Sequence, residues 1–427
     1  SLAAYIASCE LFLVLCPSIQ HECGSVMDYP SWKSRGWCRF ERLARAMAFS
    51  EDTRMLLVRR KDTVFEIGAA EWLFDPVGEG AFTVEEDKAL VGCMAQRIVR
   101  KKLEILSRGR RMEEYRQLMA ILPTLFRGLP VDPSQVVPRC VETPSGEGSV
   151  EHFTALFELP SSTLAFNRAA PVLLASCTGN VALVRRLLES QANPSRKERR
   201  VMPAFLLVRG RQPAHQAALH GHSLTLCTLL DARASVNAKD SLRMSVLHTA
   251  AFNGGVALVE ELLSRQADID SRDSIGVTPL QVAVMRNNLA VVRMLLLRRA
   301  SVSVTADGLG ALHIASQFGT SVEIVHSLLD ARAPIDSRFN PRRGRFLWVL
   351  HLCLEAGYFR GHRGFRQLVG RYIWGATPLV ASVLFGNPAI TATFVERGAD
   401  TSICTERGLD AAQMAVIFDF ACAGGAE

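Results

Sequence analysis

The chain has 427 residues, a length that predicts two or three packed domains. Its net charge of +7 and its charged fraction of 21% exclude an extremely basic or acidic protein. No uninterrupted apolar run approaches the roughly 18 residues that a membrane helix needs. The closest, Leu2 to Cys16, contains Glu10 and lacks the basic flank of a signal peptide. Eleven scattered cysteines without Cys-x-x-Cys pairs predict reduced thiols in the cytoplasm or the nucleus, and no metal site.

Residues 1–75 are expected to form an α/β segment. A buried apolar strand is predicted at Leu11–Leu15, a helix at Arg42–Phe49 and a second strand at Arg54–Val58. Strands and helices that alternate at this spacing favour a parallel α/β layer. Because the chain begins with Ser1 inside this pattern, we expect only part of the domain.

The tract that opens the predicted helix contains Trp37, Cys38 and Glu41 at the spacing Trp-Cys-x-x-Glu. It resembles the middle of a TIR domain. For TIR domains that hydrolyse NAD, the resemblance implies that Glu41 is catalytic and stabilises the positive charge developing on the ribose as nicotinamide leaves, with NAD as a substrate. The alternative is that Glu41 is an exposed helix carboxylate and Trp37 a core anchor.

Residues 76–128 are predicted to form a helical region. Thr83 and Glu86 fit a capping box for a helix running to about Leu106. A second helix, Met112 to Leu122, is expected to stop near Pro123. The C-terminal half of the first helix carries Arg97, Arg100, Lys101, Lys102, Arg108, Arg110 and Arg111. These cations either form the solvated side of a packed helix or contact an anionic membrane or a partner.

Residues 129–163, rich in proline, glycine and serine, are the predicted linker. Beyond them, a tract reading Gly-Val-Thr-Pro-Leu-Gln-Val-Ala at Gly276 to Ala283 recurs at about 33-residue intervals. Equivalent positions are held by His215, His248, Gln281 and His313. This period, with two short helical patterns per copy, is typical of a stacked solenoid.

These tracts resemble the ankyrin repeat, whose helix-turn-helix unit opens with Thr-Pro-Leu-His and closes on Gly-Ala-Asp. The resemblance extends over Phe166 to Ile417, and we count about seven full or degenerate repeats plus a terminal stub at Gly408–Ala412. The fold class is therefore mainly α, with a solenoid at residues 164–427. The resemblance implies protein binding through the concave face and the fingertips. It also assigns the recurrent histidines a structural role rather than a metal-binding one.

Partner-binding residues are expected at the fingertips and at the exposed turns of the first helices. They are Ser241, Leu242, Met244, Phe252, Asn253, Ser274, Ile275, Val277, Met285, Arg286, Ala306, Leu309, Gln317 and Phe318. Several are apolar, so Phe252, Met285 and Phe318 could form an anchoring patch. The alternative for Phe252 and Phe318 is packing between repeats.

Two basic clusters lie in the repeats. Arg196–Arg200 belongs to a finger about nine residues longer than the others, and an irregular repeat is predicted at residues 338–372. The stretch Arg338–Arg371 interleaves arginines with aromatic residues. Either this stretch contacts nucleic acid or an anionic membrane, or its arginines form a solvated face over a core that the aromatics line. A loop at this place is the alternative to a repeat.

The sequence thus predicts a cytoplasmic, or else nuclear, interaction scaffold or adaptor without cofactors or metals. The alternative is a TIR-type NAD hydrolase or signalling module regulated by the repeats. High-salt stability of a captured complex would favour the scaffold over polyanion binding, whose affinity falls steeply with salt.

Overall fold

The computed structural model describes residues 11–16, 19–20, 26–27, 29–48, 54–60, 63–66, 75–109, 111–132, 136, 153, 157, 170–198, 209–303, 309–340 and 373–417. It divides into two compact units, Ser1–Ser241 and Leu242–Glu427. Both contain helical repeats, and the first also contains a small sheet and a helical region. Within the described ranges, no helix is long and apolar enough to cross a membrane.

The sheet of the first unit has the strand order β1 (Leu11–Leu15), β4 (Arg54–Arg60), β5 (Thr63–Glu66). β1 and β4 are the two predicted strands, and they pair in parallel as expected. β5 pairs with β4 in the antiparallel direction, so the sheet is mixed. Two short strands, β2 (Ile19–Gln20) and β3 (Val26–Met27), pair separately.

One face of β1 is exposed rather than buried as predicted. Leu13 and Leu15 are 51% and 72% exposed, whereas Val14 packs with Met55 and Leu57. Trp32, on helix α2 (Tyr29–Ser34), packs against this small core. The alternation follows the two-residue period of a strand with one covered face.

Helix α3 spans Gly36–Ala46, so it begins six residues before the predicted start at Arg42. The early start depends on a contact distant in sequence. Gly36 N–H donates to Ala81 O at 2.8 Å. A Cβ atom at Gly36 would lie 2.1 Å from the Phe82 ring, so only glycine allows this approach.

The helical region contains a short 3₁₀ helix, η2 (Val77–Glu79), and the helices α4 (Asp87–Arg108) and α5 (Met112–Leu125). The predicted capping box is wrong, because α4 begins after Glu86 without a side-chain cap. Trp37 Nε1–H instead donates to Asp87 Oδ2 at 2.9 Å and ties the start of α4 to α3.

The predicted end of α5 near Pro123 is also wrong, because Pro123 lies inside the helix. The last turn of the helix continues past Pro123, because Phe126 N–H donates to Leu122 O at 3.0 Å. Two residues of the predicted linker that the structure describes, Phe153 and Phe157, pack within the first unit. Phe153 and Phe157 are buried with ring centroids 4.5 Å apart, and Arg116 Nε–H donates to Phe157 O at 2.9 Å.

The repeats form helix pairs. The first unit holds α8 (Ala170–Thr178) with α9 (Val181–Glu189) and α10 (Pro213–Leu219) with α11 (Ser223–Asp231). The second holds α12 (Val246–Asn253) with α13 (Val256–Ser264), α14 (Pro279–Met285) with α15 (Leu289–Leu297), α16 (Ala311–Phe318) with α17 (Val322–Asp330), α20 (Pro378–Leu384) with α21 (Pro388–Glu396), and the single helix α22 (Ala411–Ile417).

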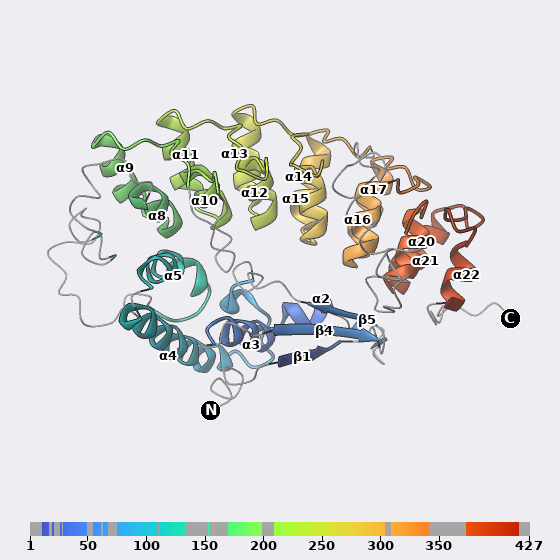
Figure 1. The fold of residues 1–427 in the computed structure, drawn as a ribbon, viewed down its shortest axis with the longest axis horizontal. Coiled ribbons are helices and arrows are strands. Elements are labelled where there is room, and N and C mark those ends of the chain that lie inside the picture. The colour runs from blue at the N-terminus through green and yellow to red at the C-terminus, as the bar shows by residue number, and fades with distance from the viewer. Residues whose placement is uncertain are drawn as a thin grey trace. The chain divides into compact units, whose positions relative to one another are not determined.

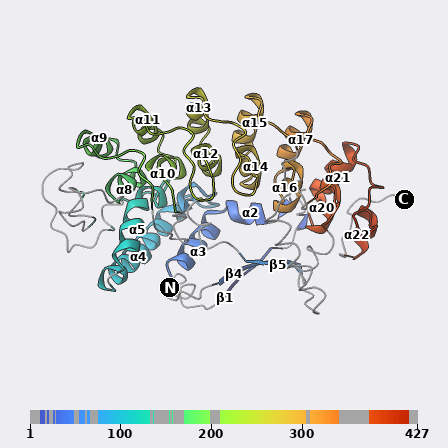
Figure 2. The ribbon, with the colours of Figure 1, turned by 45° about the horizontal axis from the view of Figure 1, so that its top comes forward.

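Two layers build the second unit, as Figures 1 and 2 show. The first helices α12, α14, α16, α20 and α22 pack in that order in one layer, and the second helices α13, α15, α17 and α21 pack in the other. Small and branched side chains at the helix interfaces, such as Ala250, Ala283 and Ala315, are completely buried and let neighbouring helices approach closely.

A hydrogen bond from the third residue joins α12 to the repeat of α14, and α14 to the repeat of α16. His248 Nε2–H donates to Val277 O at 2.9 Å, and Gln281 Nε2–H donates to Leu309 O at 2.8 Å. Each acceptor directly precedes the N-cap residue of the following first helix, Thr278 or Gly310. This bond therefore identifies which repeats are neighbours in the stack.

By this criterion, α16 is the neighbour of α20. His313 Nε2–H donates to Ala376 O at 3.1 Å, and Ala376 directly precedes the N-cap Thr377 of α20. Ser316 Oγ–H also donates to Pro378 O at 2.8 Å. The repeats of α16 and α20 are thus direct neighbours, although the irregular repeat predicted at 338–372 lies between them in the sequence. Residues 341–372 themselves lie outside the described part of the chain.

Candidate partner-binding surface

The predicted binding residues lie at two places in the second unit: the C-terminal ends of the first helices and the tips of the fingers. Exposed side chains are those of Leu242, Ser274, Gln317 and Phe318, and half-buried ones are those of Met244, Phe252, Asn253, Ile275, Met285, Arg286 and Leu309. Ser241 is exposed and belongs to the first unit. Ala306 lies outside the described residues.

Val277 does not fit the prediction. Its side chain is 4% exposed, and its carbonyl oxygen accepts the hydrogen bond from His248. It therefore joins two repeats and offers a partner no side-chain surface. The sequence placed Val277 within a finger, but position in a hairpin does not reveal which side chain turns inward.

The helix-end residues of neighbouring repeats come together. The Arg286 guanidinium carbon lies 4.8 Å from the centroid of the Phe252 ring, within the range of a cation–π contact. Phe318 occupies the position of Arg286 one repeat further on, and it is 40% exposed. We define Phe252, Met285, Arg286, Gln317 and Phe318 as the helix-end row. It combines three apolar side chains with the Arg286 cation and the Gln317 amide at the ends of packed helices.

The fingers are aligned by backbone hydrogen bonds. Ser274 N–H donates to Leu242 O at 2.8 Å, and Glu406 N–H donates to Trp374 O at the same distance. Asp273 is committed to its own turn, because its Oδ1 accepts hydrogen bonds from Ile275 N–H and Val277 N–H, both at 2.9 Å. Burial raises the pKa of Asp273, and these bonds oppose that shift.

Two exposed arginines of the fingers were missed by the sequence reasoning. Arg243 and Arg272 flank the tip residues Leu242 and Ser274. Their signal was available in the sequence, because arginine is enriched at protein interfaces and both arginines lie within two residues of a predicted fingertip residue. Together with Arg286, they make the described part of this surface mainly basic and apolar.

The second candidate site, around Glu41, lies on α3. Glu41 is half-buried, and desolvation raises its pKa, while the charge of Arg35 lowers it. The neighbouring Cys38 thiol is buried, and desolvation together with the Glu41 charge raises its pKa to about 11. Such a thiol is protonated at neutral pH and is a poor nucleophile.

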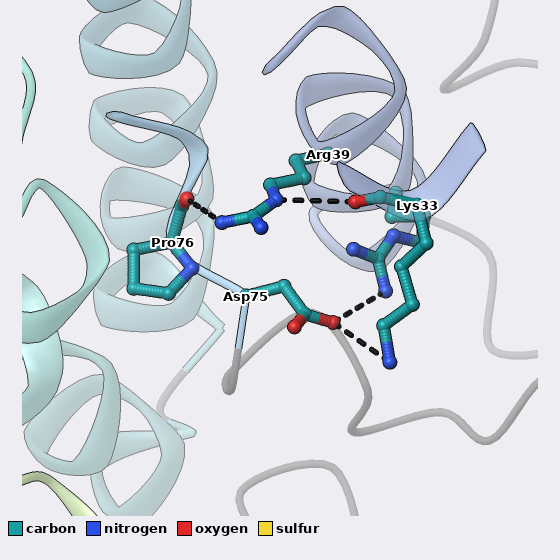
Figure 3. A network of polar contacts seen from close by, with 5 residues as sticks. Lys33, Arg39, Asp75 and Pro76 are labelled. Atoms are coloured by element: carbon teal, nitrogen blue, oxygen red, sulfur yellow. Dashed lines mark hydrogen bonds and ion pairs between the residues drawn. The ribbon is translucent and has the colours of Figure 1, made fainter. Parts of the chain in front are cut away.

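Basic side chains of α2 and α3 form a polar network with Asp75 (Figure 3). Lys33 Nζ and Arg42 Nη1 each lie 3.0 Å from Asp75 Oδ2, and Arg39 donates to Lys33 O at 3.1 Å and to Pro76 O at 3.0 Å. The Arg42 side chain is 1% exposed. These contacts fasten α3 to the segment that leads into η2, so the network is part of the fold around Glu41. Trp37 contacts Asp87 and packs edge-on against the buried Phe40, which agrees with its alternative interpretation as a core anchor.

The described histidines and carboxylates form no group of three or more that could hold a metal ion. The repeat histidines are used in capping and in bonds between repeats: Ser245 N–H donates to His248 Nδ1 at 3.1 Å while His248 Nε2–H bonds to Val277.

A family model for ankyrin repeats, in three copies, matches residues 247–339. This range covers the three helix pairs from α12 to α17, so these residues are ankyrin repeats. No curated protein matches the chain. The resemblance of the N-terminal segment to a TIR domain stays a prediction.

Proposed function

We propose that this chain is a scaffold or adaptor that holds a partner protein on the helix-end row and the adjoining fingertips of its second unit. Ankyrin repeats are in general protein–protein interaction modules, and a stack of them exposes a long surface whose side chains vary without disturbing the core. We propose that the protein acts in the cytoplasm or the nucleus.

The observation that carries this proposal is the pairing of Arg286 with Phe252 beside the exposed Phe318. Aromatic and arginine side chains are the commonest binding hot spots, and rigid helices hold them at little entropic cost on binding. Their neighbours Leu242 and Ile275 extend the apolar surface onto the fingers.

The test is affinity capture from a cell extract with the full chain, in parallel with Phe318→Ala and the control Leu297→Ala. Leu297 is 77% exposed on α15, in the other layer, so its removal also takes away a large exposed apolar side chain. We expect a discrete protein, retained at high salt, whose affinity falls about tenfold or more with Phe318→Ala and is unchanged with Leu297→Ala. A partner that is captured equally by both variants would exclude the helix-end row.

The alternative proposal is a TIR-type NAD hydrolase or signalling module regulated by the repeats, with Glu41 as the catalytic carboxylate. The parallel pairing of β1 and β4, with α2 and α3 between them in the chain, favours it. The test is NAD consumption by the full chain and by Glu41→Gln. Because the pKa of Glu41 is raised, the rate should increase with pH as the carboxylate ionises. NAD loss that Glu41→Gln leaves intact would refute this role.

A further inference from the structure

Helix α4 has a solvent-facing side that the proposed function does not use. Its buried side chains, among them Val91, Val99 and Leu103, recur at helical spacing and pack the helix into the first unit, where α4 contacts α3 and α5. On the other side, Arg97, Arg100, Lys101 and Arg108 are exposed. We call these four residues the basic face of α4.

Two neighbouring cations, Lys102 and Arg111, are not counted in this face. Lys102 Nζ donates to Ala48 O at 2.7 Å, and Arg111 makes a bidentate pair with Glu114 at 2.6 and 2.7 Å. In α4 and the turn before it, the acidic residues are the exposed Glu85 and Glu86, Asp87, which pairs with Trp37, and the half-buried Glu104, which lies four residues from both Arg100 and Arg108. Positive charge therefore dominates the C-terminal half of the exposed side.

The helix dipole does not account for this charge. A cation is stabilised by the dipole within the last turn only, which includes Arg108. Arg97 lies eleven residues before Arg108, about 16 Å along the helix, and Arg100 and Lys101 lie about two turns before it. The dipole therefore accounts for Arg108 alone among the four cations of the basic face.

Apolar side chains interrupt the same exposed side. Leu90 is 54% exposed and Ile105 is 39% exposed, Ile105 standing between Lys101 and Arg108 in the sequence. A cationic surface with isolated apolar side chains is typical of helices that lie on the headgroup layer of a bilayer. The net charge of +7 adds a long-range attraction to anionic surfaces.

We infer that the basic face of α4 docks the protein on an anionic lipid bilayer. The cations are distributed along the outer side of a helix instead of converging on one point, which fits a surface with many anionic headgroups better than a single bound anion. Ile105 enters the headgroup layer between the cations. This role is independent of the partner surface proposed above.

The test is co-sedimentation of the full chain with vesicles of phosphatidylcholine alone and with about one third phosphatidylserine, at low and at physiological salt. We expect binding only to the anionic vesicles, and weaker binding at higher salt. The double variant Arg97→Glu and Arg108→Glu should lower the partition coefficient at least about 30-fold, because each cation near an anionic surface contributes about fivefold. Ile105→Ser should give a smaller loss.

The matched control is Arg185→Glu with Arg293→Glu, two exposed arginines on α9 and α15. It changes the net charge by the same amount and should leave the partition coefficient within about threefold. Three outcomes would overturn the inference: no preference for anionic vesicles, an equal loss in both double variants, or binding to polyglutamate but not to vesicles. Helical circular dichroism and melting of each variant exclude unfolding as the cause of a loss.

Discussion

The third residue of the first helices α12, α14 and α16 has two tasks in the repeat. Its side chain accepts a hydrogen bond from the N-cap backbone and donates another to the next repeat, as His248 and Gln281 both show. An imidazole and a primary amide each have one acceptor and at least one donor for this arrangement. The chain itself demonstrates that glutamine can replace histidine at this position.

Replacing such a histidine with glutamine should make the folded protein less sensitive to low pH. Desolvation lowers the pKa of His313 to about 4, below its unfolded value of about 6.5. A histidine with a depressed folded pKa contributes stability above the unfolded pKa, and that contribution is lost as the pH falls from about 6.5 toward 4. In urea titrations of the full chain, His313→Gln should reduce the fall in unfolding free energy between pH 7 and pH 5 by about 2 kcal/mol.

The control for this prediction is the stability at pH 7. His313→Gln should be close to the wild type there, because glutamine can make both hydrogen bonds at this position, as Gln281 does. An unchanged pH dependence would show that the His313 proton does not contribute to acid unfolding. His220, whose pKa burial lowers to about 3, remains in both proteins.

At the scale of elements, two of the equivalent hydrogen bonds that the described residues make at the base of a finger are separated by more residues than the others. Asp273 N–H donates to Val277 O with three residues between them, and Thr405 N–H donates to Leu409 O likewise. The equivalent bonds join Glu198 to Arg211 and Phe339 to Ala376. The first interval has nine extra residues, 199–207, as expected from the sequence, and the second has 33, 340–372.

The second interval exceeds its equivalents by one full repeat period. An insertion of one full period leaves every later repeat in phase, so counting along the chain cannot distinguish it from a stacked unit. Local signals were reliable where the cause was local: Thr278 and Thr377 are N-caps, with Pro279 and Pro378 in the first turn, as predicted. The start of α3 was missed because Ala81 and Phe82, far along the chain, determine it.

Deleting residues 340–372 should therefore leave the stack intact. Phe339 would then be followed by Ile373, as Asp273 is followed by Ser274, and its bonds with Ala376 and Gly375 would be kept. We expect the thermal midpoint to change by less than about 4 °C, the shift that 1 kcal/mol produces in a small domain.

The control is a deletion of equal length, residues 330–362, which removes the end of α17 and Phe339. It should lower the midpoint strongly, because Phe339 is buried, lies with its ring centroid 6.2 Å from that of His313, and pairs with Ala376. If both deletions were equally destabilising, residues 340–372 would have to contribute to the stack.

At the scale of the molecule, the helical region is continuous with the repeats of the first unit. α5 packs on α8, and α8 packs on α10, so α5 covers the side of the first repeat that a preceding repeat would otherwise cover. Solenoids need such a terminal cap because each unit leaves an apolar face for its neighbour. The predicted boundary at residue 164 falls between α5 and α8.

A fragment that begins at residue 164 should consequently be less stable than one that begins at residue 76. It lacks Leu118, Ile121 and Leu122 of α5, all buried, and burial of each such side chain contributes about 1.5–3 kcal/mol. In thermal melts followed by circular dichroism, we expect the midpoint of 164–427 to lie at least about 5 °C below that of 76–427. Equal midpoints would mean that the repeats need no cap from α5. In that case the helical region would be a separate domain that only contacts them.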